Sequence, residues 1–325
     1  MSMNILITGV AGFIGSNLTK HLLKMNHRVT GIDNFSYGSA TNMSEFIHHP
    51  NFIFLEKDLC LPSSLEGLRP EILVHLASYK IPRYSTAFPT LEFNGLMLKN
   101  VVKFCVDAKV KLVYASTSDV YGKNNHVPFH EESNLVIGPS TVKRWAYAIS
   151  KIYGEQYIIA NHDEFGLNFC ITRFFGSYGP NQNLTWWGGP QSVFIAQALL
   201  RQPIEIHGDG SQTRTFTFVD DTVDGLTKCI LDDKADGEIF NIGTEPDAEI
   251  SILALADRIW KMINPDDSDP MINFIPYSSF GKYEDVMRRV PNISKIKNRL
   301  GFSPKYSLDS GLQITIDWQR DLKSL

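Results

Sequence analysis

Tyr147 and Lys151 are the two residues whose types and spacing best suit proton transfer. On a helix, side chains four positions apart lie on the same face, one turn from each other. A free tyrosine has a pKa of about 10, which is too high for a base near neutral pH, but a neighbouring ammonium group favours the phenolate. The spacing therefore predicts that Tyr147 takes a proton from a substrate hydroxyl, although such a pair also arises by coincidence on helices.

A second group of polar side chains, Thr117, Ser118 and Asp119, follows the apolar run Lys111–Ala115. Hydroxyls at the carboxyl end of a central parallel strand lie where ligands bind in doubly wound sheets. Asp119 adds a carboxylate that could act as an acid or base, or could simply cap a short helix in solvent. We expect this group to meet Tyr147 in one site.

The glycines Gly9, Gly12 and Gly15 are spaced G-x-x-G-x-x-G between an apolar run and a helical pattern. Small residues there let the backbone approach a pyrophosphate, whose charge is stabilised by the helix N-terminus. Asp33 ends the next apolar run about 20 residues later, where a carboxylate accepts hydrogen bonds from ribose hydroxyls and repels a 2′-phosphate. The pattern predicts NAD rather than NADP as cofactor, with Asp33 as a solvated loop residue the alternative.

Short apolar runs alternate with helical patterns through the first half of the chain, which predicts a parallel sheet covered on both faces. The predicted strands are Asn4–Thr8, Val29–Ile32, Asn51–Leu55, Ile72–Leu76, Lys111–Ala115 and Phe169–Arg173. The predicted helices are Phe13–Met25, Leu91–Ala108, Tyr147–Asn161, Ser192–Leu200, Thr222–Leu231 and Ile252–Met262. We expect an α/β, doubly wound Rossmann-type domain over residues 1–175. A smaller substrate domain is expected over 176–325, with some segments returning to the first domain.

The composition narrows the function classes. With 31 Lys and Arg against 35 Asp and Glu, the 325-residue chain has a net charge of −4, which disfavours nucleic-acid and anionic-membrane partners. Four dispersed cysteines favour a reducing compartment and argue against a zinc site, and no histidine spacing suggests a metal. No segment has the roughly 18 apolar residues of a membrane span. We expect a cytoplasmic protein without a metal.

Taken together and in this order, the motifs resemble those of the extended short-chain dehydrogenase/reductase family, and within it the nucleotide-sugar epimerases, dehydratases and decarboxylases. The resemblance rests on the glycine turn, the hydroxyl group, the Y-x-x-x-K pair, and the segments His75–Ser78 and Arg173–Pro180. It covers nearly the whole chain. It implies that Tyr147 is the base, that Lys151 is its partner and contacts the nicotinamide ribose, and that Thr117 contacts O4 of a sugar.

The resemblance also implies the other contacts. For the cofactor, NAD, the expected residues are Gly9, Gly12, Phe13, Ile14, Gly15, Asp33, Asn34, Asp58, Leu59, Leu76, Ala77, Ser78, Lys80, Tyr147 and Lys151. For the substrate, they are Arg83, Thr117, Gly176, Asn181, Arg214 and Arg289, the last two arginines holding a diphosphate. The implied substrate is a UDP-sugar. The family's usual homodimer would form through the helices Leu91–Ala108 and Tyr147–Asn161.

Asp119 bears on which reaction follows oxidation at C4. Plain 4-epimerases usually have a small or hydroxyl residue at this place, whereas dehydratases and UDP-glucuronate decarboxylases have an acidic one, usually Glu. Ser118 replaces the Asp that 4,6-dehydratases use, and Gly176 replaces an Asn that contacts substrate phosphate, for which Asn181 or Asn183 could substitute. The resemblance favours dehydration or decarboxylation at C5/C6, with Thr117, Ser118, Asp119, Tyr147 and Lys151 as catalytic residues.

Three alternatives stay open at this point. The first is a UDP-hexose 4-epimerase acting on glucose, GlcNAc or glucuronate. The second is a non-catalytic NAD-binding sensor, for which the complete set Thr117, Tyr147 and Lys151 would be unnecessary. The third is an NADPH ketoreductase of small carbonyls, which Asp33 and the long C-terminal half disfavour.

Overall fold

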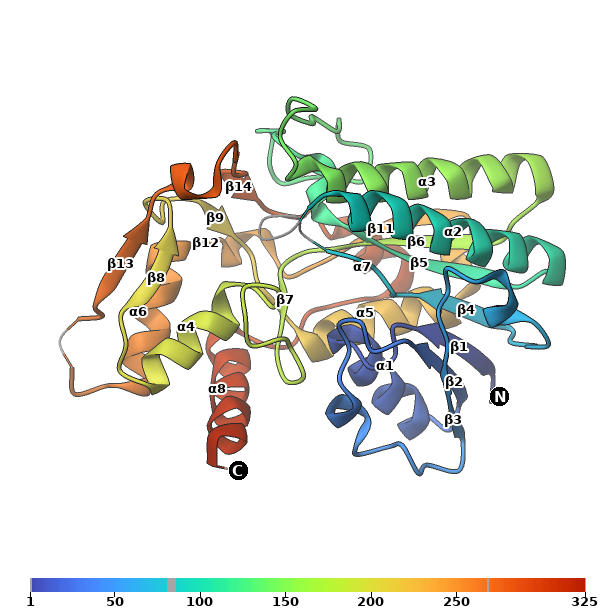
Figure 1. Cartoon of the computed structure of the whole chain (residues 1–325), viewed down its shortest axis with the longest axis horizontal. Coiled ribbons are helices and arrows are strands. Elements are labelled where there is room, and N and C mark those ends of the chain that lie inside the picture. Colours follow the sequence, from blue (N-terminus) through green and yellow to red (C-terminus); the bar gives the residue numbers. More distant parts are fainter. Residues whose placement is uncertain (1, 81–85, 268, 325) are drawn as a thin grey trace.

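The computed structural model describes residues 2–80, 86–267 and 269–324. Seven parallel strands form its central sheet, in the order β11-β6-β5-β4-β1-β2-β3 (Figure 1). Their bounds are β1 Asn4–Thr8, β2 Arg28–Asp33, β3 Phe52–Glu56, β4 Ile72–His75, β5 Lys111–Thr117, β6 Phe169–Phe174 and β11 Glu238–Ile242. β1, β4, β5 and β6 are almost entirely buried, as expected for strands covered on both faces.

Helices cover the two faces of this sheet. α2 (Phe88–Ala108) packs beside α3 (Trp145–Phe165) over one face, and α1 (Phe13–Lys24) packs with α5 (Val219–Leu231) over the other (Figure 1). α7 (Ser294–Leu300) lies against β11. The strand order reverses between β1 and β4, and open α/β sheets bind their ligands outside the carboxyl ends of the strands at that point.

The remaining elements form a smaller layer at one side of the sheet (Figure 1). Its helices are α4 Pro190–Leu199, α6 Ile252–Ile263 and α8 Leu308–Ser324. Its short strands are β7 Ser177–Tyr178, β8 Ile204–His207, β9 Thr213–Arg214, β10 Thr217–Phe218, β12 Ile250–Ser251, β13 Ile272–Ile275 and β14 Arg288–Arg289. β14 pairs with β9, so the chain near residue 289 is fixed against the chain near residue 214.

The predicted doubly wound α/β fold is confirmed, and all six predicted strands and six predicted helices are present, β1 with the predicted ends and the others with shifted ends. The patterns missed β11, α7, α8 and the short strands of the smaller layer. β11 and α5 belong to the second half of the chain but join the first-half sheet. The division into domains at residue 175 stays a prediction. Among the helices that the structure describes, none is long and apolar enough to cross a membrane.

Candidate active site

A single cavity of about 1010 Å³ lies at the carboxyl ends of the central strands and brings most of the predicted residues together. Its predicted cofactor residues are Gly9, Gly12, Phe13, Ile14, Gly15, Asp33, Asn34, Leu59, Leu76, Ala77, Ser78 and Lys80. Its predicted catalytic and substrate residues are Thr117, Ser118, Asp119, Tyr147, Lys151, Gly176, Asn181, Arg214 and Arg289. Asp58 is not part of the lining; its Oδ1 accepts from the backbone N–H of Cys60 at 2.9 Å. Arg83 lies outside the described residues.

The glycine turn has the geometry of a dinucleotide cradle. A Cβ on Gly15 would lie 2.1 Å from the carbonyl oxygen of Gly9, and one on Gly9, whose φ is +75°, would lie 2.8 Å from the backbone nitrogen of Ala77. Side chains at these positions would therefore collide with backbone that cannot move away. The residues fit the pyrophosphate of NAD, which could approach the bare backbone at the start of α1.

Asp33 supports this turn from the end of β2. Its Oδ2 accepts from the N–H of Ala11 and its Oδ1 from the N–H of Phe35, each at 2.9 Å. Burial raises the pKa of Asp33, and the backbone N–H groups oppose this effect. The carboxylate thus fixes the loop on one side and lines the cavity on the other, where a ribose diol would meet it.

Tyr147, Lys151 and Thr117 meet in the wall of the cavity. Lys151 is 3% exposed; its Nζ donates to the carbonyl of Ala115 at 2.8 Å and lies 5.9 Å from the centre of the Tyr147 ring. Burial lowers the pKa of Lys151 to about 7, with Glu155 opposing that shift. Burial and the Asp119 carboxylate raise the pKa of Tyr147 well above 10, whereas hydrogen bonds with Thr117 and Ser78 lower it. The phenolate that the Y-x-x-x-K spacing leads one to expect is therefore not favoured in the ligand-free protein.

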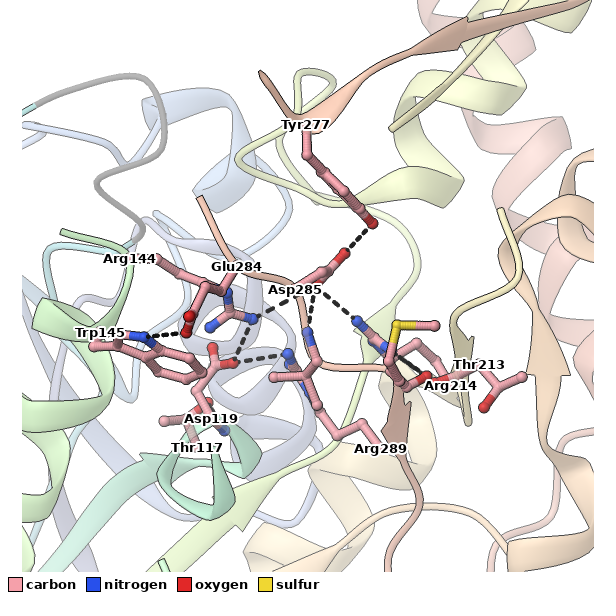
Figure 2. Close-up of polar contacts among 12 residues, drawn as sticks. Thr117, Asp119, Arg144, Trp145, Thr213, Arg214, Tyr277, Glu284, Asp285 and Arg289 are labelled. Atoms are coloured by element: carbon pink, nitrogen blue, oxygen red, sulfur yellow. Dashed lines mark hydrogen bonds and ion pairs between the residues drawn. The ribbon is translucent and has the colours of Figure 1, made fainter. Parts of the chain in front are cut away.

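Asp119 lies within a cluster of guanidinium groups (Figure 2). Its Oδ1 is 2.8 Å from Nη2 of Arg289 and 3.5 Å from Nη2 of Arg144. Burial alone would raise the pKa of Asp119, but the guanidinium groups of Arg289, Arg144 and Arg214 outweigh burial and lower it. Asp119 is therefore ionised at neutral pH and is a weak base.

A second carboxylate, Asp285, completes the cluster. Its Oδ1 is 3.2 Å from Nη2 of Arg214 and 3.7 Å from Nη2 of Arg144, and its Oδ2 accepts from the Tyr277 hydroxyl at 2.6 Å (Figure 2). Burial and the neighbouring Arg289 lower the pKa of Arg214 to about 10, so Arg214 stays charged at neutral pH. Within the part of the chain that the structure describes, this cluster holds three guanidinium groups and two carboxylates, one more positive than negative charge.

Gly176 has a structural reason to lack the family's asparagine side chain. Its φ is +51°, and a Cβ would lie 2.4 Å from the carbonyl oxygen of Thr215. Asn181 lines the cavity near the glycine turn, with its Nδ2 3.2 Å from the Ser16 hydroxyl oxygen. Asn183 also lines the cavity, but its Oδ1 accepts from Thr185 within its own loop.

The sequence patterns missed Arg144 and Asp285 as site residues. Arg144 stands three positions before Tyr147, so the two side chains lie on nearly the same face of the helix. This spacing could have indicated Arg144 as a site residue. Asp285 lies in an irregular segment between β13 and β14, and only the pairing of β14 with β9 brings it to the site. Among the described residues, no group of three or more His, Cys, Asp or Glu side chains could hold a metal; the absence of a metal stays a prediction.

Comparisons with known proteins identify the family of the chain. The NAD dependent epimerase/dehydratase family matches residues 5–243. A UDP-N-acetyl-alpha-D-glucosaminuronate decarboxylase from Bacillus cytotoxicus is 33% identical over 328 residues, 100% of each chain. The structure of UDP-glucose 4-epimerase from Thermotoga maritima with UDP-glucose superposes with a TM-score of 0.87 at 28% identity, covering 99% of this chain and 100% of that one.

UDP-glucuronic acid 4-epimerase from Bacillus cereus, in complex with UDP-glucuronic acid and NAD, is also similar. Its TM-score is 0.86 at 29% identity, covering 98% of this chain and 100% of that one. The family match spans well over half of the chain, and the decarboxylase matches its full length. The chain therefore belongs to the NAD-dependent epimerase/dehydratase family, as an enzyme of the extended short-chain dehydrogenase/reductase type that uses NAD.

Proposed function

We propose that this enzyme decarboxylates a UDP-linked hexuronic acid after transient oxidation at C4. The observation that carries the proposal is the set of guanidinium groups around Asp119, beside Thr117 and Tyr147. The proposal gives these arginines a substrate carboxylate in place of the diphosphate that the resemblance implies for Arg214 and Arg289. A hexose presents a neutral C6 hydroxyl, whereas a hexuronic acid presents a carboxylate that guanidinium groups bind well. The similarity to a UDP-sugar acid decarboxylase supports the same choice of substrate.

Bound NAD would supply the acceptor for the C4 hydride and would return that hydride later. The positive charge of bound NAD⁺, added to that of Lys151, would favour the Tyr147 phenolate. In that form Tyr147 takes the C4 hydroxyl proton, with Thr117 hydrogen-bonded to it. The resulting C4 ketone makes the sugar a β-keto acid. The C5–C6 bond then breaks, carbon dioxide leaves, and the electron pair moves to the C4 oxygen to give an enolate. The C4 ketone re-forms as C5 is protonated, and Tyr147 would give its proton to the C4 oxygen when the hydride returns to C4. Solvent supplies the proton that C5 gains.

The balance of charge in the cluster suits this step. A strongly cationic pocket would stabilise the carboxylate more than the transition state, in which its charge disperses, and would slow the reaction. Asp119 and Asp285 compensate two of the three guanidinium groups. The substrate carboxylate would thus be bound by the remaining excess charge while lying close to the Asp119 carboxylate, whose repulsion disappears when carbon dioxide leaves.

Dehydration at C5/C6 requires a base for the C5 proton, and this requirement disfavours it. Asp119 is the carboxylate next to Thr117 in the chain, and its lowered pKa makes it a poor base. Decarboxylation requires no base at C5, because the bond that breaks there is C5–C6.

The second candidate is 4-epimerisation of the same UDP-hexuronic acid. The specific observation in its favour is the similarity to UDP-glucuronic acid 4-epimerase over 98% of this chain. Epimerisation uses the same C4 oxidation but leaves the C5–C6 bond intact.

Turnover of UDP-glucuronic acid and its N-acetylglucosamine analogue in D₂O, followed by NMR, separates these reactions. Decarboxylation places one solvent deuterium at C5, whereas epimerisation leaves the original hydrogen there. Asp119→Asn is the accompanying variant: if Asp119 were a C5 base, this variant would lose C5 exchange while C4 oxidation continued. We expect C5 deuteration in the wild-type product; a product without deuterium at C5 would make the enzyme an epimerase.

We also propose a homodimer through α2 and α3. These helices lie side by side and carry exposed apolar side chains, among them Leu91 (47% exposed), Ile149 (40%) and Tyr153 (42%). Large apolar residues clustered on an exposed surface mark a protein interface. Light scattering of the wild type should give twice the chain mass of 36.7 kDa, and Ile149→Glu should reduce it to that of one chain.

A further inference from the structure

Glu155 is a buried carboxylate that lies one helical turn beyond Lys151 on α3 and plays no part in the mechanism above. Tyr147, Lys151 and Glu155 are spaced four residues apart, so they follow one another along the same side of the helix. The Glu155 side chain is 4% exposed, and carboxylates are rarely buried to this extent unless they are paired.

Both oxygens of Glu155 have partners. Oε2 is 2.6 Å from Nη2 of Arg173, Oε1 accepts from Nε of Arg173 at 3.0 Å, and the Ser116 hydroxyl also donates to Oε1. Arg173 is itself 4% exposed and donates further, to the Tyr121 hydroxyl at 3.0 Å and the Glu131 carbonyl at 2.7 Å. The Glu155–Arg173 pair is thus bidentate and belongs to a fully buried network.

These contacts join α3 to the two strands that end at the site. Ser116 directly precedes Thr117 on β5, and it is paired in register with Arg173 on β6. Glu155 therefore fixes the helix that carries Tyr147 and Lys151 to the strand that carries Thr117.

Glu155 also acts on Lys151 electrostatically. Burial is the largest influence on the Lys151 ammonium and lowers its pKa to about 7; the Glu155 carboxylate raises that pKa, and the Lys80 ammonium lowers it. From β4, His75 faces Lys151 as a neutral ring, because burial and Lys151 lower its pKa to about 3. From β5, the Tyr114 ring faces Lys151, with its centre 4.7 Å from the Lys151 Nζ. The Tyr114 hydroxyl is uncharged, because burial raises its pKa.

We propose that Glu155 is a positioning residue that keeps Lys151 protonated and correctly placed for proton transfer at Tyr147. It acts through Lys151 and touches neither substrate nor cofactor. Arg173 compensates the Glu155 charge, so loss of Glu155 alone would remove an attraction and also leave the Arg173 charge unbalanced in the same interior. Both effects favour the neutral amine of Lys151. The proposal depends on the proposed function only in taking Tyr147 as the proton acceptor.

Competitive labelling with acetic anhydride, read by mass spectrometry of the Lys151 peptide across pH, tests this without any sugar substrate. In Glu155→Gln, which keeps the size and removes the charge, the midpoint of Lys151 labelling should fall by roughly one pH unit or more. The alkaline limb of the kcat profile should move to lower pH by the same amount, because the protonated lysine is the active form. Glu155→Asp, which keeps the charge, should retain most of the wild-type midpoint.

Glu131→Gln is the matched control. Glu131 is also a buried carboxylate of this network, with its Oε1 accepting from the N–H of Asn241 at 2.8 Å, but it is not among the groups that shift Lys151. The Glu131→Gln variant should be less stable than the wild type but should have the same midpoint of Lys151 labelling. If Glu155→Gln does not fold, the double variant Glu155→Gln/Arg173→Gln removes both charges and should shift the midpoint in the same direction by less.

Two results would overturn the proposal. One is a Lys151 midpoint in Glu155→Gln, or in the double variant, that coincides with the wild type. The other is a midpoint shift equal in Glu131→Gln and Glu155→Gln, which would reduce Glu155 to a structural role. Neither result depends on which sugar the enzyme uses, so failure here is distinct from failure of the decarboxylase assignment.

Discussion

Asp119 and Arg289 form an ion pair with an Oδ1–Nη2 distance of 2.8 Å, although they are 170 positions apart in the chain (Figure 2). Asp119 follows β5 of the central sheet, and Arg289 is in β14 of the smaller layer. The pair therefore joins the two parts of the molecule at the reacting end of the cavity, where the proposed substrate carboxylate would bind.

Arg289→Gln should weaken binding of a UDP-hexuronic acid by roughly ten-fold or more, since a hydrogen bond to a charged group contributes about 1.5–3 kcal/mol. Binding of UDP-glucose, which has no carboxylate, should weaken much less. Calorimetric titration with both ligands measures the difference. Arg288→Gln is the control, because Arg288 is paired with Glu249 at 2.6 Å and lies outside the cavity lining. Equal losses for both ligands would assign Arg289 to the diphosphate instead.

Tyr147→Phe should reduce kcat by about 10²–10⁴-fold, the usual contribution of a positioned acid or base, while NAD still binds. The ring stays and only the hydroxyl is lost. Assays with the NAD-loaded enzyme measure this loss of turnover rate. Tyr153→Phe, on the exposed side of the same helix, should have near wild-type kcat. Substantial turnover by Tyr147→Phe would show that another group accepts the proton.

Gly15→Ala should abolish NAD binding or weaken it severely, because the new Cβ would lie 2.1 Å from the Gly9 carbonyl oxygen and force the turn apart. Fluorescence titration with NADH reports the affinity. Gly95→Ala is the matched control: nothing lies within 4 Å of a Cβ there, in the middle of α2, and alanine favours a helix by about 0.5–1 kcal/mol. An unchanged NADH affinity in Gly15→Ala would show that the dinucleotide does not approach this turn.

Lys151 should make stability depend on pH with a defined sign. Its pKa falls from 10.5 in the unfolded chain to about 7 in the folded protein, so the unfolded chain holds more protons between these values. Stability should therefore rise with pH through this window, and the full penalty of the buried charge should be present below it.

Lys151→Met should accordingly unfold at a higher temperature than the wild type at about pH 6, and this advantage should shrink towards about pH 9. Differential scanning calorimetry across this range provides the measurement. A gap in Tm that is constant with pH would mean that Lys151 titrates near its ordinary value in the folded protein.

The sequence predicted the sheet well because apolar β-runs next to helical patterns are local signals. β11 was not predicted, because its segment, Glu238–Ile242, contains charged and polar residues. Its pairing with β6 is also not visible in the neighbouring sequence. The strand predicted over Lys111–Ala115 was too short, because it continues through Ser116 and Thr117. Both residues are buried but polar, so they lie outside the apolar run on which the prediction rested.

The site was predictable where spacing along one element places its residues. The glycine turn and the Y-x-x-x-K pair are such cases. Asp285 and Glu155 were not predictable, because their effects depend on partners that only the tertiary structure brings close. Asp285 is paired with Arg214, and Glu155 is paired with Arg173. Asp119 was singled out from the sequence and lines the cavity, but its guanidinium partners, which lower its pKa and weaken it as a base, could not be identified from sequence.

The product mass after incubation with a UDP-hexuronic acid tests the central claim most directly. The purified enzyme with NAD is given UDP-glucuronic acid and UDP-N-acetylglucosaminuronic acid in separate reactions, with UDP-glucose as the control substrate. The proposed function predicts that at least one acid loses carbon dioxide while UDP-glucose loses no mass as carbon dioxide or water. Unchanged masses with an inverted C4 signal in NMR would contradict it and identify an epimerase; loss of water from a sugar would identify a dehydratase.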